Sequence, residues 1–261
     1  MSDETIERVI PGTLSWKQYG AEHIQRYEFF KDYYTNKSVL DAACGTGYGS
    51  HYMAQNGAAR VLGIDISDEA VDFAKKNYVL PQLTYLKEDC LNVQGLHKKF
   101  DLVISFETVE HLSDPELFFK NIAFVLTPGG TFICSTPNKD RLSGAGNINP
   151  FHHNELAWKD FKRLFETYFV PGKSYQQSES VEYMRYQELK HMLHQSSAQS
   201  KAFFFSKLES FFRRSVGKPF KPIPFFRDDL DYLYPQDIYI EPLQETESWH
   251  KTYIITGTLK S

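Results

Sequence analysis

The chain has 261 residues, of which 41% are apolar and 24% are charged. This balance is that of a globular protein with room for one α/β core and an added subdomain. The formal net charge of −4 argues against general binding of nucleic acids, because proteins that bind them are usually basic. Three cysteines, no secretory signal pattern and no apolar run of about 18 residues predict a cytoplasmic protein without a disulfide framework or a transmembrane segment.

Short apolar runs between residues 37 and 136 predict buried strands. They are residues 37–41, 60–65, 83–87, 101–106 and 130–136. Amphipathic stretches between them predict helices, one beginning at Ser67 and another at residues 113–116. This alternation is typical of right-handed β-α-β units, and therefore of a mostly parallel sheet with helices on both faces.

The flanking segments predict further elements. An aromatic-rich helix is expected over residues 16–34, and helical spacing recurs in residues 156–168, 181–193 and 201–212, before a late strand in residues 249–259. We therefore expect a helical cap (1–36), a Rossmann-like core (37–180 and 245–261) and a helical insertion (181–244).

Within that insertion, residues 201–221 carry six basic side chains and six phenylalanines with a single acid. This pattern favours an ordinary helix whose phenylalanines pack on the core. The alternative is an amphipathic surface that makes peripheral contact with anionic lipid. The acidic residues Asp228, Asp229 and Asp231 weaken that alternative because they would repel the same surface.

A glycine-rich turn follows the first predicted strand, where residues 41–49 read Asp-Ala-Ala-Cys-Gly-Thr-Gly-Tyr-Gly. Glycine at positions 45, 47 and 49 permits positive φ and lets a ligand approach the backbone closely. The helix that follows would direct its unpaired N–H groups into the same crevice. Such a turn alone suits any nucleotide cofactor.

Acidic residues at the ends of the first three strands reduce the number of nucleotide cofactors that would fit this turn. Asp65 is placed to accept the hydroxyls of a ribose, and Asp89 to accept an adenine amino group. Asp41 suits a cofactor with a positively charged portion, whereas the pyrophosphate of a dinucleotide would repel it. The full set of predicted cofactor contacts is Asp41, Ala43, Gly45, Gly47, Asp65, Ile66, Asp89, Cys90, Ser105 and Phe106.

This combination, together with the Leu-Thr-Pro-Gly-Gly run at residues 126–130, resembles the class I S-adenosylmethionine-dependent methyltransferases. The resemblance covers residues 37–136. It implies a Rossmann-like, doubly wound, mostly parallel sheet of seven strands with an antiparallel last strand, and S-adenosylmethionine as the cofactor.

A second group of polar residues follows the fourth strand. Glu107 and Glu110 are three residues apart and would share a face of a helical turn, with His111 beside them. His152 or His153 would join them if the loop after the fifth strand folds over the same crevice. Two carboxylates and two imidazoles suit Mg²⁺ or Mn²⁺, although imidazole would also accept Zn²⁺ or Fe²⁺.

This run is similar to that of ubiquinone-pathway O-methyltransferases and of terminal-ribose methyltransferases of small RNAs, in which such residues hold a metal. The resemblance implies Glu107, Glu110, His111 and His152 as ligands, with His153 as an alternative ligand or a base. A closer likeness, up to about residue 180, is to bacterial methyltransferases linked to surface-glycan assembly. It is carried by residues 8–12, 23–27, 106–111, 135–138 and 149–152.

We therefore expect an enzyme that O-methylates a hydroxyl of a saccharide or small molecule, with help from a divalent ion. A metal lowers the pKa of a hydroxyl bound to it, and such hydroxyls are otherwise poor nucleophiles. One alternative is catalysis by Glu110, His111, His152 and His153 without a metal, and another is a purely structural role for them. Other acceptors considered are a quinone, a polyphenol and an amino sugar; a non-catalytic cofactor-binding module is the alternative to an enzyme.

Overall fold

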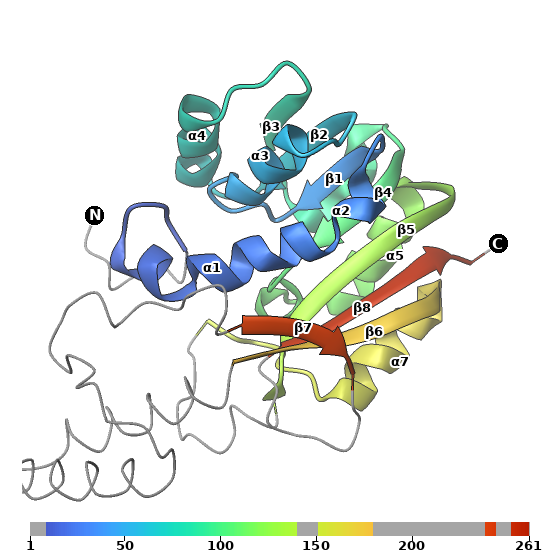
Figure 1. Ribbon diagram of the computed structural model, residues 1–261. Coiled ribbons are helices and arrows are strands. Elements are labelled where there is room, and N and C mark those ends of the chain that lie inside the picture. Colours follow the sequence, from blue (N-terminus) through green and yellow to red (C-terminus); the bar gives the residue numbers. More distant parts are fainter. Residues whose placement is uncertain (1–8, 140–150, 180–237, 244–251, 261) are drawn as a thin grey trace, which may run out of the picture.

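The computed structural model describes residues 9–139, 151–179, 238–243 and 252–260. A single sheet of eight strands passes through them, in the order β3-β2-β1-β4-β5-β8-β6-β7 (Figure 1). The helices predicted in residues 181–193 and 201–212, and the basic and aromatic stretch within 201–221, lie outside the described residues.

The strands are β1 (Ser38–Ala42), β2 (Arg60–Asp65), β3 (Leu83–Lys87), β4 (Phe100–Ser105), β5 (Leu126–Pro137), β6 (Phe169–Glu179), β7 (Ile238–Pro242) and β8 (Thr252–Leu259). β1 to β5 pair in parallel, and β8 runs antiparallel to both β5 and β6. The predicted parallel strands and the antiparallel last strand are confirmed. The predicted start of the fifth strand was late, because β5 begins at Leu126 rather than at residue 130.

The sheet has eight strands where seven were expected. The additional strand is β7, whose residues fall in the range 181–244 that was assigned to the insertion. β7 pairs antiparallel with β6 from Tyr175↔Pro242 to Glu179↔Ile238. It thereby satisfies backbone N–H and C=O groups that an edge strand would otherwise leave unpaired.

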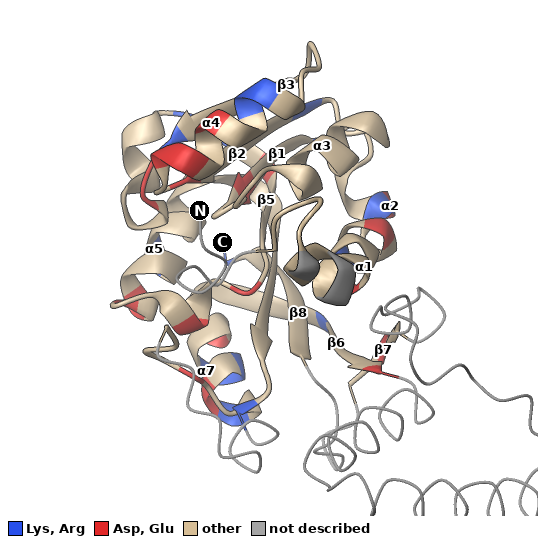
Figure 2. Ribbon diagram, turned by 90° about the vertical axis from the view of Figure 1, so that its left-hand side faces the viewer, with Lys and Arg blue, Asp and Glu red and all other residues tan. Residues whose placement is uncertain are grey.

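Helices cover both faces of the sheet (Figures 1 and 2). The α-helices are α1 (Leu14–Phe29), α2 (Lys31–Tyr34), α3 (Tyr48–Gln55), α4 (Asp68–Asn77), α5 (Pro115–Val125) and α7 (Trp158–Tyr168), with two 3₁₀ turns, η1 (Cys90–Leu96) and η2 (Val109–His111). α1 and α3 lie on one face, whereas α5 and α7 lie on the other. None of the helices in this described part of the chain has the length and hydropathy that a membrane span requires.

Local sequence signals explain where these helices begin. The Ser67 hydroxyl accepts a hydrogen bond from the backbone N–H of Ala70, which confirms the predicted start of α4. Asp114 caps α5 by accepting from Leu117, directly before Pro115. The single helix predicted over residues 16–34 is divided at Phe30 into α1 and α2.

The two faces of β5 contribute to separate apolar cores. Phe132 packs among Phe119 and Phe165 on the side of α5 and α7. The next residue, Ile133, belongs to the core beneath α1, which also contains Phe30. This alternation follows from the two-residue period of a strand, and it also decides where the polar side chains at the end of β5 point.

Candidate active site

The turn between β1 and α3 has the left-handed backbone that its glycines predict. Ala43, Gly45 and Gly47 have φ values of 62°, 55° and 83°. A Cβ on Gly47 would meet the Cβ of Ala74 at 2.6 Å, so this position needs glycine for space as well as for φ. The Cys44 N–H donates to the carbonyl oxygen of Ile64 at 2.8 Å, which ties the turn to β2.

Asp65, at the end of β2, lies directly against this turn. Its Oδ2 accepts from the backbone N–H of Gly45 at 2.9 Å, and its Oδ1 accepts from that of Ser67 at 3.0 Å. The structure therefore brings together the glycine turn and the predicted ribose-binding acid, which are 20 residues apart in sequence. The neighbouring Ile66 side chain is 62% exposed, an apolar surface beside the acid.

Asp89 occupies the corresponding position after β3. Its Oδ1 accepts from the backbone N–H of Leu91 at 2.8 Å, so Asp89 caps η1. The adjacent Cys90 is buried, and burial raises the pKa of its thiol to about 12. A neutral thiol is a weak nucleophile, so Cys90 is suited to packing beside Asp89 rather than to nucleophilic chemistry.

Asp41 is buried between α1 and α3. Its carboxylate accepts from the hydroxyl of Ser50 at 2.6 Å and from that of Tyr27 at 3.4 Å. Burial raises the pKa of Asp41 to about 7, against the opposing effect of these two hydrogen bonds. A cation nearby would favour the ionised form, as the predicted amino-acid portion of the cofactor requires.

The end of β4 adjoins the glycine turn. The Ser105 hydroxyl donates to the carbonyl oxygen of Ala42 at 2.9 Å, and the Phe106 ring packs edge-on against Tyr27 at 5.0 Å. Because β1 and β4 are neighbouring parallel strands, the loops that follow them meet at one edge of the sheet, where ligands bind in open α/β folds.

Glu110, His111 and His152 meet at this edge. Each offers one ligand atom, and these atoms all lie within 4.8 Å of one another. The two imidazole rings are 4.9 Å apart, centroid to centroid. Residues 151–154, which follow β5 in the sequence, therefore lie beside Glu110, and they are held there because the backbone N–H groups of His153 and Asn154 donate to the carbonyl oxygen of Glu110 at 2.8 and 2.9 Å.

Both imidazoles are oriented through Nδ1. That of His111 lies 3.0 Å from the carbonyl oxygen of Phe151, and that of His152 lies 2.8 Å from Oε1 of Glu155. Since a carbonyl oxygen can only accept, Nδ1 of His111 carries a proton, and Nε2, which lies 3.9 Å from Oε1 of Glu110, is the atom of this ring that could bind a cation. Histidines that bind metals are commonly oriented in this way.

The carboxyl group of Glu110 is 1% exposed. Its Oε2 accepts from the Thr136 hydroxyl at 3.1 Å, while its Oε1 has no hydrogen-bond partner within the described part of the chain. Burial and the nearby Glu107 raise the pKa of Glu110 well above its ordinary value. A buried carboxylate oxygen beside two oriented imidazoles fits the donor set of a divalent cation.

Glu107 was expected to share a face of a helical turn with Glu110, and the structure places it differently. It has a φ of 51°, so it is not helical, and η2 begins only at Val109. The two glutamates therefore do not share a face, and the structure leaves Glu107 outside the group of Glu110, His111 and His152. His153, the alternative ligand, is exposed and also lies outside it.

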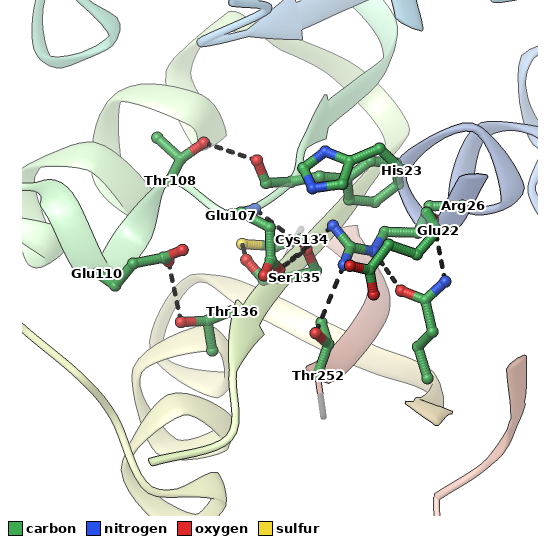
Figure 3. Close-up of polar contacts among 12 residues, drawn as sticks. Glu22, His23, Arg26, Glu107, Thr108, Glu110, Cys134, Ser135, Thr136 and Thr252 are labelled. Carbon is green, nitrogen blue, oxygen red and sulfur yellow. Dashed lines mark hydrogen bonds and ion pairs between the residues drawn. The ribbon is translucent and has the colours of Figure 1, made fainter. Parts of the chain in front are cut away.

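Sequence reasoning missed Arg26, a residue of α1 that is 1% exposed. Its Nη1 lies 3.5 Å from Oε1 of Glu107 (Figure 3). Arg26 falls within residues 23–27, which carried part of the likeness to glycan-associated enzymes. An arginine in an aromatic-rich predicted helix was the available signal, but its partner could not be identified from the sequence.

Comparison with known proteins agrees with this geometry. Residues 40–134 match the family model described as a methyltransferase domain. A probable S-adenosylmethionine-dependent methyltransferase of Mycolicibacterium smegmatis is 32% identical over 165 residues, 62% of this chain and 63% of that protein. The ubiquinone biosynthesis O-methyltransferase of Coxiella burnetii is 36% identical over 107 residues, 40% of this chain and 45% of that protein. The chain thus spans less than two thirds of the length of either relative.

Solved structures show the same fold at low sequence identity. An S-adenosylmethionine-dependent methyltransferase from Archaeoglobus fulgidus is similar over 93% of this chain and 94% of its own, with a TM-score of 0.56 and 17% identity. The magnesium protoporphyrin IX methyltransferase of Synechocystis, solved with bound S-adenosylhomocysteine, covers 63% of this chain and 84% of its own, with a TM-score of 0.51 and 22% identity. Residues 40–134 therefore resemble a methyltransferase domain, and the chain has the fold of these S-adenosylmethionine-dependent methyltransferases.

Proposed function

We propose that the protein is a cytoplasmic methyltransferase that uses S-adenosylmethionine to O-methylate a hydroxyl of a saccharide or other small molecule. The bound cofactor would supply the methyl group. The arrangement of Asp65 against Gly45, with Asp89 after the next strand, supports its binding at the ends of β1, β2 and β3. The relatives named as methyltransferases support the reaction type.

The choice of a hydroxyl acceptor depends on one observation, the meeting of Glu110, His111 and His152 at the edge where the glycine turn also lies. These residues would hold a divalent cation such as Mg²⁺ or Mn²⁺. When bound, such an ion lowers the pKa of a hydroxyl attached to it. Thr136 orients Glu110, while Phe151 and Glu155 orient the imidazoles.

Displacement at the methyl group needs an in-line approach, so positioning is the main contribution of the protein. The ends of β1 and β4 would provide this positioning. β1 leads into the glycine turn, and β4, the adjacent strand, leads into the segment that contains Glu110 and His111. In a reaction without a cation, the imidazoles of His111 and His152 are the candidate bases, and the exposed His153 at the rim is a third.

A quinone or polyphenol is the second candidate acceptor, favoured by the similarity to the ubiquinone biosynthesis enzyme of Coxiella burnetii. A catechol and a saccharide can both present two adjacent hydroxyls, so the same three residues suit either. For residues 201–221, packing of the phenylalanines on the core stays the favoured prediction, and peripheral membrane contact stays its alternative.

The test is transfer of a labelled methyl group from S-adenosylmethionine to a panel of acceptors. The panel should pair methyl glycosides that carry adjacent hydroxyls with catechol, and each with its mono-hydroxylated counterpart. We expect transfer to one diol class, loss of transfer after exhaustive chelation, and recovery with Mn²⁺. Full activity after chelation would refute cation assistance, and absence of S-adenosylhomocysteine binding by calorimetry would refute the methyltransferase assignment itself.

A further inference from the structure

Glu107 is held by contacts from two sides, one from Ser135 and one from Arg26. The hydroxyl of Ser135 accepts from the Glu107 backbone N–H at 3.1 Å and donates to Oε1 of the same residue at 2.6 Å. The left-handed backbone at Glu107, with φ of 51°, is unfavourable for a residue with a side chain. Strain of this kind persists only where the surroundings hold it, and it concentrates at functional sites.

Arg26 approaches the same carboxylate from α1. Its guanidinium is held from two further directions, since Nε donates to Oε1 of Gln177 at 2.5 Å and Nη2 donates to the Thr252 hydroxyl at 3.5 Å. α1 is thereby fastened to β6 and β8. Nη1, which faces Glu107 at 3.5 Å, is buried and makes no hydrogen bond to the described residues (Figure 3).

The direction of each glutamate follows from the period of β5. Ser135 and Thr136 are consecutive in that strand, so their side chains point to opposite faces. Ser135 binds Glu107 on the face covered by α1, whereas Thr136 binds Glu110 on the face covered by α5 and α7. Figure 3 shows Glu107 beside Ser135 and Arg26, and Glu110 beside Thr136.

We propose that Arg26 is a positioning residue that keeps Glu107 out of the cation group. A divalent ion would then be held by Glu110, His111 and His152 alone, and Glu107 would remain a carboxylate able to accept a hydrogen bond from an acceptor hydroxyl. An ion pair sheltered from water competes effectively for a carboxylate, because its attraction is only weakly screened. This inference depends on the proposed cation assistance.

The test is a double-mutant cycle read by Mn²⁺ affinity, measured by calorimetry with MnCl₂ alone on the full chain. The variants are Arg26→Gln, Glu107→Gln and the combination of both. Removing Arg26 frees Glu107 to become a further ligand, so we expect Arg26→Gln to bind Mn²⁺ about tenfold more tightly than the wild type. The gain should vanish in the combined variant, and Glu107→Gln alone should leave the affinity within about threefold of the wild type.

Two further variants separate positioning from charge. Arg26→Lys keeps the positive charge, so it should retain most of the wild-type behaviour. Ser135→Ala removes the hydroxyl contact of Glu107 and leaves the ion pair with Arg26, so it should bind Mn²⁺ within about threefold of the wild type. A tenfold gain in Ser135→Ala would assign the positioning of Glu107 to Ser135 and overturn the inference. Arg26→Met, which also removes the charge, replaces Arg26→Gln if that variant does not fold.

The outcomes are distinguishable. A gain that persists in the combined variant would show a simple charge effect and overturn the inference. So would a loss in Glu107→Gln as large as that in Glu110→Gln. Mn²⁺ binding by the wild type with no gain in Arg26→Gln refutes the inference alone. No Mn²⁺ binding by any variant refutes both the inference and cation assistance, while S-adenosylhomocysteine binding reports separately on the methyltransferase assignment.

Discussion

Ser135 and Thr136 are consecutive residues of β5, and each donates a hydrogen bond to a different glutamate of the loop after β4. Ser135 binds Glu107 at 2.6 Å, and Thr136 binds Glu110 at 3.1 Å. The alternation of strand side chains thus divides two nearby carboxylates between two environments, one facing Arg26 and one facing two imidazoles. Glu107 and Glu110 should therefore respond differently when the residues around them are changed.

His152 and His153 form a matched pair for testing the cation group. His152 lies within it, whereas its neighbour His153 is exposed and lies outside it. We expect His152→Ala to weaken Mn²⁺ binding by at least about tenfold. Mutation of residues that only orient a ligand typically lowers metal affinity by about 10–100-fold, and loss of the ligand itself should cost at least as much. His153→Ala should change the affinity by less than about twofold. Equal losses in calorimetric titrations of the two variants would contradict the assignment.

Asp65→Asn is expected to weaken binding of S-adenosylhomocysteine by about tenfold or more. The carboxylate accepts two backbone N–H groups, and its loss removes charge-assisted hydrogen bonds to the turn and to the predicted ribose. Asp68→Asn is the control. Asp68 lies three residues after Asp65, is exposed and forms an ion pair with the exposed Lys87, so its substitution removes one acid without touching the glycine turn. Calorimetry on both variants gives the comparison, and unchanged affinity in Asp65→Asn would exclude the predicted role.

Gly47→Ala should lower the free energy of unfolding by about 2–4 kcal/mol. Positive φ accounts for about 1–2 kcal/mol, and crowding of the new methyl group against Ala74 and Tyr85 adds a similar amount. At Gly95, φ is not positive and a new methyl group would meet no atom of the described residues within 4 Å, so Gly95→Ala should change stability by less than about 0.5 kcal/mol. Urea denaturation measures both, and similar values for the two variants would show that the turn tolerates a side chain.

Asp41 predicts a pH dependence of stability. Its pKa is about 7 in the folded protein and is raised from 3.8 by burial. Stability that comes from the neutral carboxyl is therefore fully present below about pH 4 and is lost as pH rises to about 7. Across this window the free energy of unfolding of the wild type should fall relative to that of Asp41→Asn by roughly 1.4 kcal/mol per pH unit.

Urea denaturation at several pH values measures this difference, with Asp68→Asn as the exposed control. The control should follow the wild type at every pH. Parallel curves for Asp41→Asn and the wild type would mean that Asp41 is already ionised in the folded protein, against its burial between Ser50 and Tyr27.

The sequence by itself determined the parallel strands, the glycine turn and the position of Asp65. These features depend on local causes, because apolar runs, left-handed glycines and helix caps act over a few residues. The acids at the ends of neighbouring parallel strands must then meet at one edge, and Asp65 does bind Gly45. The same edge suggested that Glu110 and His111 would lie near a histidine of the later loop, and the family resemblance selected His152 rather than His153.

Tertiary structure alone decided the direction of Glu107, the partner of Arg26 and the pairing of β7. Spacing suggested that Glu107 would join Glu110, but a left-handed φ and the alternation of β5 turned it away. Arg26 and Gln177 are 151 residues apart, and no local pattern joins them. Such contacts depend on which buried charges and strand edges the folded chain brings together, and on the need to pair them away from water.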